Sequence, residues 1–100
     1  MKVYLDDERI APIGWVQCRW AQDVIKLLQC EDVTHLSLDH DLGDDSISTG
    51  YDVITWIEQA IAFDGFIPPH IVVHSANPSA REKMIMGIKS IVRLSNGVTK

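Results

Sequence analysis

Short apolar runs alternate with longer apolar stripes along the chain, and this alternation predicts an α/β fold. Four segments have strand character: residues 2–5, 15–19, 34–38 and 71–73. After the second, third and fourth of them, apolar residues recur at intervals of three and four, which is the period of one helix face. These stripes comprise Ala21, Val24, Ile25 and Leu28, then Val53, Ile54, Ile57 and Ile61, then Met84, Ile85, Ile88 and Ile91.

Strands that alternate with helices predict a three-layer α/β sandwich with a mostly parallel sheet. Thr49 followed three residues later by Asp52 indicates the start of the second helix, and residues 65–69 indicate its end. Asn77 followed by proline is typical of the start of the third helix. Residues 91–94 are interpreted as a last, short strand.

Length and charge narrow the function. A chain of 100 residues predicts a single domain spanning residues 1–100. The net charge of −5 argues against binding duplex nucleic acid by neutralising phosphates, but is compatible with metal-assisted action on a nucleotide or an RNA end. Apolar runs far below the roughly 20 residues of a membrane span predict no membrane association, and the N-terminus has no signal-peptide pattern.

The cysteines and tryptophans are interpreted as packing residues. Cys18 and Cys30 fit no zinc-binding spacing, so we expect buried, reduced thiols and a cytoplasmic protein. A base-stacking platform is the alternative for the tryptophans, and a place in the core or the shell around it is favoured; they are Trp15, Trp20 and Trp56.

Carboxylates follow two of the predicted strands directly. Asp6 and Asp7 follow the first, and Asp39 follows the third, so a parallel sheet would bring them to the edge where such sheets bind ligands. Converging carboxylates repel one another unless a cation lies among them, and Mg²⁺ prefers oxygen ligands. We therefore predict a Mg²⁺ or other divalent-metal site at these three residues. The remaining nearby acids are interpreted as solvated loop residues: Glu8, Asp44 and Asp45.

The segment of residues 74–78, His-Ser-Ala-Asn-Pro, joins the fourth strand to the third helix. Backbone N–H groups and the helix dipole favour an anion at such a junction. Arg81 lies in the first turn, where a cation is unfavourable unless an anion offsets it. Ser75, Asn77 and Arg81 are therefore predicted to bind phosphate; a capped helix with a surface arginine is the alternative.

Two histidines lie at the predicted ligand-binding edge. His40 stands between two aspartates, and His74 ends a strand beside Ser75. Either can act as general acid or base near neutral pH, with Asp41 orienting the ring. His35 and His70 begin strands at the other edge and are given no role.

Four segments together resemble the receiver domain of two-component signalling. Residues 5–8 resemble its acidic pair, residues 36–39 place Asp39 at the phospho-acceptor position, residues 50–52 begin a helix with a glycine, and residues 72–76 place Ser75 at the switch position. The loop of residues 8–14 is too short for the first receiver helix, so the second strand is expected to be displaced, antiparallel or lost. No lysine–proline pair follows residues 91–94, which argues against ordinary phospho-relay.

Three further motifs are similar to the cyclic-phosphate-processing receiver domains. They are Asp-His-Asp-Leu-Gly at 39–43, Thr-Gly-Tyr-Asp at 49–52 and His-Ser-Ala-Asn-Pro at 74–78. The resemblance implies a shortened receiver-like (flavodoxin-like) topology and a role in handling cyclic phosphates of nucleotides or RNA ends.

Three functional hypotheses stand at this point. The first is a metal-dependent hydrolase of a small cyclic-phosphate nucleotide or an RNA end, in which Asp39 can also act as nucleophile. The second is a phospho-acceptor or cyclic-phosphate-binding module that signals to a protein partner. The third, least favoured because Asp and His gather at one edge, is a receiver fold with only a structural role.

Overall fold

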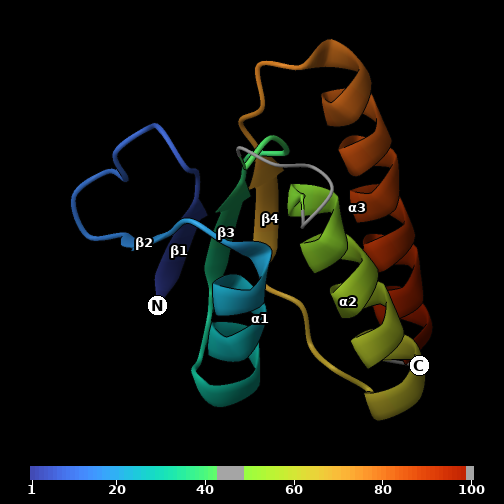
Figure 1. The fold of residues 1–100 in the computed structure, drawn as a ribbon. Helices are drawn as coiled ribbons and strands as arrows, with labels where there is room; N and C mark the ends of the chain where they lie inside the picture. Colours follow the sequence, from blue (N-terminus) through green and yellow to red (C-terminus); the bar gives the residue numbers. More distant parts are fainter. Residues whose placement is uncertain (43–48, 99–100) are drawn as a thin grey trace.

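The computed structural model describes residues 1–42 and 49–98, with side chains described up to residue 96. Along the chain the elements are β1 (Lys2–Leu5), β2 (Val16–Cys18), α1 (Ala21–Cys30), β3 (His35–Leu38), α2 (Gly50–Asp64), β4 (His70–Val73) and α3 (Pro78–Val98), as labelled in Figure 1. Asp44 and Asp45, predicted to be solvated, lie outside the described residues.

The four strands form one parallel sheet in the order β2-β1-β3-β4. The centre of the sheet is in register at Val3, Leu36 and Ile71. This confirms the α/β class and the receiver-like topology. The second strand was expected to be displaced, antiparallel or lost. In the structure β2 is present and pairs in parallel with β1, although the connection of residues 6–15 contains no helix. A loop suffices because β1 and β2 are immediate neighbours.

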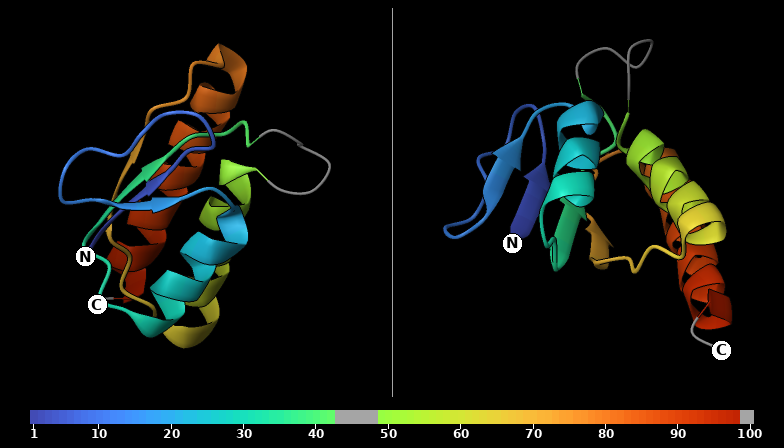
Figure 2. Two further views of the ribbon diagram at one scale, coloured as in Figure 1. Left: turned by 60° about the vertical axis from the view of Figure 1, so that its left-hand side comes forward. Right: turned by 90° about the horizontal axis from the view of Figure 1, so that it is seen from below.

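The three helices pack against the same side of the sheet (Figure 2). Val3, Leu5 and Leu36 point to the helices and are completely buried, whereas the alternate residues Lys2 and His35 are exposed on the other side. The described part of the chain therefore has two layers, and not the three expected, because the missing first receiver helix leaves the second face of the sheet without a helix.

The third helix is longer than the sequence pattern suggested. Residues 91–94, predicted as a strand, lie inside α3, and Ile91 is buried against the core. The prediction was wrong because Met84, Ile88 and Ile91 continue the helix stripe at intervals of four and three. The predicted starts are right: Asn77 Oδ1 accepts the Ala80 N–H (3.2 Å). None of the described helices is both long and apolar enough to cross a membrane.

The two cysteines have different environments, and this predicts different reactivity. Cys18 is buried, and burial followed by the charge of Asp23 raises the pKa of its thiol to about 11. Cys30 is free but exposed, so the expectation that both are buried was wrong for Cys30. Because only thiolates alkylate readily, we expect iodoacetamide at pH 8 to modify Cys30 alone in the native protein and both residues after denaturation. Peptide mass mapping checks this, and equal labelling of Cys18 in the native protein would contradict it.

Candidate functional site

Three carboxylates converge where β1 and β3 end. One carboxylate oxygen each from Asp6, Asp7 and Asp39 lies within 4.8 Å of the other two. β1 and β3 are neighbouring parallel strands, so Asp6 and Asp39 leave the sheet side by side, and Asp39 N–H donates to the carbonyl of Leu5 (2.9 Å). The structure therefore brings together the three residues predicted from the sequence as a metal site.

The carboxylate of Asp6 is buried and held by three hydrogen bonds. Its Oδ1 accepts the backbone N–H groups of Glu8 and Arg9 (both 2.8 Å), and its Oδ2 contacts Nε2 of His74 (3.0 Å). Burial raises the pKa of Asp6, but the two N–H groups and His74 outweigh burial and leave the pKa below its ordinary value. Asp6 is therefore a fixed anion.

Asp39 has the opposite electrostatic character. Burial, and then the neighbouring charge of Asp6, raise the pKa of Asp39 above its ordinary value, although the His40 N–H donates to its Oδ1 (2.9 Å). Within the described residues no Lys or Arg forms an ion pair with Asp6, Asp7 or Asp39; the two cations nearby, Arg9 and Arg19, donate to carbonyl oxygens instead. Apart from His74, which contacts Asp6, the three carboxylates thus have no basic ion-pair partner among the described residues, and a divalent cation would relieve the repulsion between them.

Gly50 holds the backbone of Asp39 in place. Its N–H donates to the His40 carbonyl (3.1 Å), and it begins α2. A Cβ at this position would overlap the Asp39 carbonyl group and lie 3.0 Å from the Met84 side chain. The close approach of α2 to the end of β3 therefore requires glycine.

His74 is enclosed on three sides. Its Nδ1 lies 2.7 Å from the Ser37 hydroxyl, its Nε2 bonds to Asp6, and its ring stacks on Tyr4 with centroids 4.3 Å apart. Asp6, as an anion, only accepts hydrogen bonds, so Nε2 carries a proton; Nδ1 then accepts from Ser37 in the neutral ring and donates to it in the charged one. Both ring nitrogens are therefore occupied by the protein.

Sequence reasoning missed Ser37 and Tyr4 as partners of His74. Both belong to strands, and the pairing Tyr4–Ser37 puts them opposite each other on the face away from the helices. The signal in the sequence was the serine between Leu36 and Leu38, and the structure shows that Ser37 is buried. Its partner could not be read from the sequence, because His74 lies 37 residues further along the chain.

His40 has one ring nitrogen engaged. Its Nδ1 contacts Asp41 Oδ1 at 2.8 Å, and no described residue is a hydrogen-bond partner of its Nε2. The His40 side chain is 17% exposed and that of Asp41 50% exposed. The contact predicted between Asp41 and a histidine is present, and the second nitrogen of His40 has no partner within residues 1–42 and 49–96.

Residues 75–77 lead into α3, which begins at Pro78 as predicted. Ser75 is buried and its Oγ accepts the Asn77 N–H (3.2 Å), while Asn77 caps the helix. Arg81 is exposed, and no described residue is an ion-pair partner of its guanidinium. The arrangement contains the capped helix of the simpler interpretation, together with an unneutralised cation in its first turn.

The family model of the cyclic-phosphate processing receiver domain matches residues 1–90. The chain belongs to this family. No curated protein and no solved structure matches the chain significantly. The family match covers all four strands, α1 and α2, and most of α3.

Family membership accounts for the position of the acidic cluster, and two arginines beside it were not expected from the sequence. The acidic cluster stands where the receiver resemblance placed the acidic pair and the phospho-acceptor. Arg9 and Arg19, which sequence reasoning did not single out, lie beside the cluster: Arg9 Nη1 donates to the His74 carbonyl (2.8 Å) and Arg19 Nη1 to the Asp7 carbonyl (3.3 Å). These bonds tie the loop of residues 6–15 to the ends of β4 and β2.

Proposed function

We propose that this receiver domain hydrolyses the cyclic phosphate of a nucleotide or of an RNA end at the Asp6–Asp7–Asp39 cluster. One observation carries the proposal: three carboxylates converge, without a Lys or Arg partner among the described residues, in a chain of the cyclic-phosphate-processing family. A ring-shaped phosphodiester is an anion, so a site that is itself anionic needs a cation between the two.

The residues present fit a divalent cation. Three oxygen donors within 4.8 Å of one another suit a hard ion that keeps several of its waters, and Asp6 is already fixed in its charged form. In this proposal Asp6, Asp7 and Asp39 hold Mg²⁺ or a similar ion. When bound, such an ion neutralises the phosphate and stabilises the charge that develops as the ring opens.

The start of α3 is proposed to hold the phosphate oxygens. The Ser75 hydroxyl accepts one backbone N–H, and among the described residues no acceptor takes its proton or the two N–H donors of the Asn77 amide. Arg81 contributes a positive charge in the first turn. Together with the positive end of the helix dipole, these groups favour an anion beside the acidic cluster.

His40 is the better placed of the two histidines to move a proton. Asp41 engages its Nδ1, which leaves Nε2 for the reaction, whereas both nitrogens of His74 are occupied. We assign proton transfer to the His40–Asp41 pair and assign His74 the role of positioning Asp6. Water adds to phosphorus, the bond from phosphorus to one ribose oxygen breaks, and that oxygen takes a proton, which leaves a phosphomonoester.

The test is a hydrolysis assay on 2′,3′-cyclic mononucleotides, 3′,5′-cyclic mononucleotides and an RNA ending in a 2′,3′-cyclic phosphate, each with Mg²⁺ and with EDTA. We expect Mg²⁺-dependent release of a phosphomonoester from at least one of them. No turnover on any substrate would overturn the hydrolase. In that case, mass gain on incubation with a small phosphodonor would support the phospho-acceptor alternative.

Substitution of the two histidines separates their roles. We expect His40→Gln to lower kcat by about 100-fold with little change in KM, the usual contribution of a general acid or base. His74→Gln is expected to weaken Mg²⁺ affinity by about 10-fold and to retain most of kcat at saturating Mg²⁺, because it acts through Asp6. Steady-state kinetics at varied Mg²⁺ measures both; the reverse pattern would exchange the assignments.

A further inference from the structure

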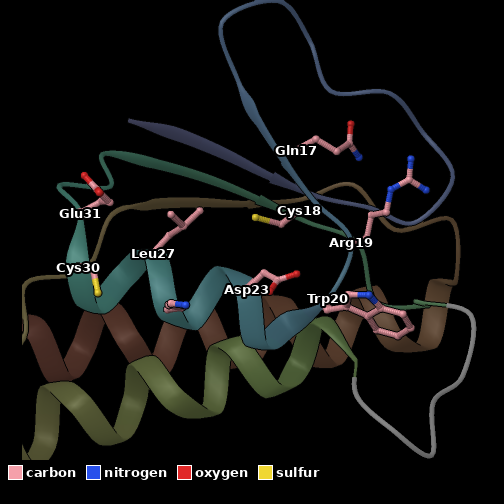
Figure 3. A pocket seen from close by; sticks show the side chains of 9 residues that line it. Gln17, Cys18, Arg19, Trp20, Asp23, Leu27, Cys30 and Glu31 are labelled. Carbon is pink, nitrogen blue, oxygen red and sulfur yellow. The ribbon is translucent and has the colours of Figure 1, made fainter.

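A groove along the β2 edge of the sheet remains unused by the proposed hydrolysis. It has a volume of about 640 Å³, within the range of small-molecule sites. β2 with the turn that follows it forms one wall, and α1 forms the other (Figure 3). The lining residues used below are Cys18, Arg19, Trp20, Asp23, Lys26 and Leu27.

Trp20 stands at the start of α1 without capping the helix through its side chain. It is the residue before α1, where Ser, Thr, Asp or Asn would cap the helix, and its side chain makes no capping hydrogen bond. Trp20 is 43% exposed, and no described aromatic residue contacts its ring, so it lies at the surface and not in the core. An exposed indole in a groove is a surface on which a flat ring can stack.

The groove contains both a hydrogen-bond acceptor and a hydrogen-bond donor. Asp23 and Lys26 are exposed and one turn apart on α1, yet neither forms an ion pair or a side-chain hydrogen bond with a described residue. The carboxylate accepts hydrogen bonds and the ammonium donates them. An aromatic face flanked by an acceptor and a donor matches a nucleobase, which is a flat ring with donors and acceptors on its edge.

The groove adjoins the acidic cluster. The Asp6 N–H donates to the carbonyl of Cys18 (3.0 Å), and the guanidinium of Arg19 reaches the Asp7 carbonyl (3.3 Å). Both residues line the groove. One ligand can therefore place a phosphate at the cluster and a base in the groove, with Arg19 between them.

We infer that the groove binds the nucleobase of a cyclic mononucleotide, stacked on Trp20 and contacted at its edge by Asp23 and Lys26. The inference rests on the proposed function for the fate of the phosphate, and it narrows the substrate class. The substrate carries a base, and the groove has room for one nucleoside.

The first test compares substrates with and without a base. The substrates are 2′,3′-cyclic AMP and GMP, the cyclic phosphate of glycerol, and an RNA ending in a 2′,3′-cyclic phosphate. Trp20→Ala is expected to raise KM for the cyclic mononucleotides by about 10-fold, with kcat nearly unchanged, through loss of stacking. Turnover of the glycerol compound should not change. Phe63→Ala, which removes another exposed aromatic on α2, is the matched control and should change nothing.

Two kinetic outcomes would overturn the assignment of the groove as a nucleobase site without contradicting the proposed hydrolysis. One is equal kcat/KM for the glycerol compound and the mononucleotides, with KM unaffected by Trp20→Ala. The other is a KM for the RNA end at least 10-fold below that of the matching mononucleotide, which would mean that contacts beyond one nucleoside determine binding.

A second test remains decisive if no substrate is turned over. Adenosine and guanosine, which carry no phosphate, are titrated into the metal-free protein and followed by NMR. We expect nucleoside addition to shift the signals of the Trp20 indole N–H and of the amides of residues 21–27. In Trp20→Ala these amide signals should no longer shift. Absence of these shifts for both nucleosides would overturn the groove assignment independently of any catalysis.

Discussion

Asp39→Asn is expected to reduce Mg²⁺-dependent hydrolysis by about 100-fold or more, the scale on which single electrostatic groups act in active sites. The change keeps the shape of the side chain and removes its charge. Asp39 supplies one of three oxygens that lie within 4.8 Å of one another, so its loss weakens the proposed cation site whether Asp39 binds metal or attacks phosphorus. Steady-state kinetics over a range of Mg²⁺ concentrations measures the effect.

Asp64→Asn is the matched control, because Asp64 is an exposed carboxylate at the far end of α2. It should retain full activity. Full activity in Asp39→Asn would contradict both the metal site and the nucleophile variant.

Although Asp39→Asn should lower activity, it should raise the stability of the metal-free protein. Because burial and Asp6 raise the pKa of Asp39 in the folded protein, folding favours its protonated form. That stabilisation is present below the ordinary carboxyl pKa and is lost as the pH rises through the raised value. At pH 7 without metal, Asp39→Asn is therefore expected to be more stable than the native protein, and the difference should shrink towards acid pH. Urea denaturation at several pH values in EDTA measures this difference in the free energy of unfolding. An Asp39→Asn variant less stable than the native protein at pH 7 would contradict charge repulsion between Asp39 and Asp6.

Gly50→Ala is expected to destabilise the fold by about 3 kcal/mol, the upper end of the usual cost of overpacking. The added Cβ would overlap the backbone of Asp39, and backbone at the end of β3 cannot move without displacing the cluster. Metal affinity should fall together with stability. Urea denaturation and Mg²⁺ titration measure the two effects.

Gly87→Ala distinguishes this steric effect from a general effect of losing glycine. A Cβ at Gly87 would meet the Ile54 Cγ2 at 2.7 Å, so this stiff, buried side chain must shift, whereas alanine favours the helix by about 1 kcal/mol and offsets part of that cost. We expect a smaller destabilisation than for Gly50→Ala, and unaltered metal affinity. Equal destabilisation by the two substitutions would contradict the role given to Gly50.

The sequence pattern predicted the elements that carry the cluster because strand alternation, helix period and carboxylates at strand ends are local signals. Asp6, Asp7 and Asp39 could be expected together once the sheet was taken as parallel. The prediction for residues 91–94 failed because four apolar-rich residues fit a short strand and a helix stripe equally well.

Features that depend on contacts across the sheet were out of reach. The hydrogen bond between Ser37 and His74 joins β3 to the residue that follows β4, and this proximity follows only from the pairing of the two strands. Likewise, an exposed Trp20 and a buried tryptophan have the same local pattern, and only the packing of α1 against β2 leaves the indole in a groove. The residue types therefore indicated the chemistry at the carboxyl ends of the strands. The contacts between these side chains depend on the topology of the sheet.

The most direct measurement of the central claim is NMR line broadening by substoichiometric Mn²⁺. We expect the amides of residues 6–9 and 39–41 to broaden first, because they surround the cluster. Residues 60–64 should stay sharp, because at about 1.5 Å per residue they lie roughly 15–20 Å along α2 from Gly50. Asp39→Asn should abolish the pattern. Broadening centred elsewhere, or the same pattern in the variant, would contradict a divalent-cation site at Asp6, Asp7 and Asp39.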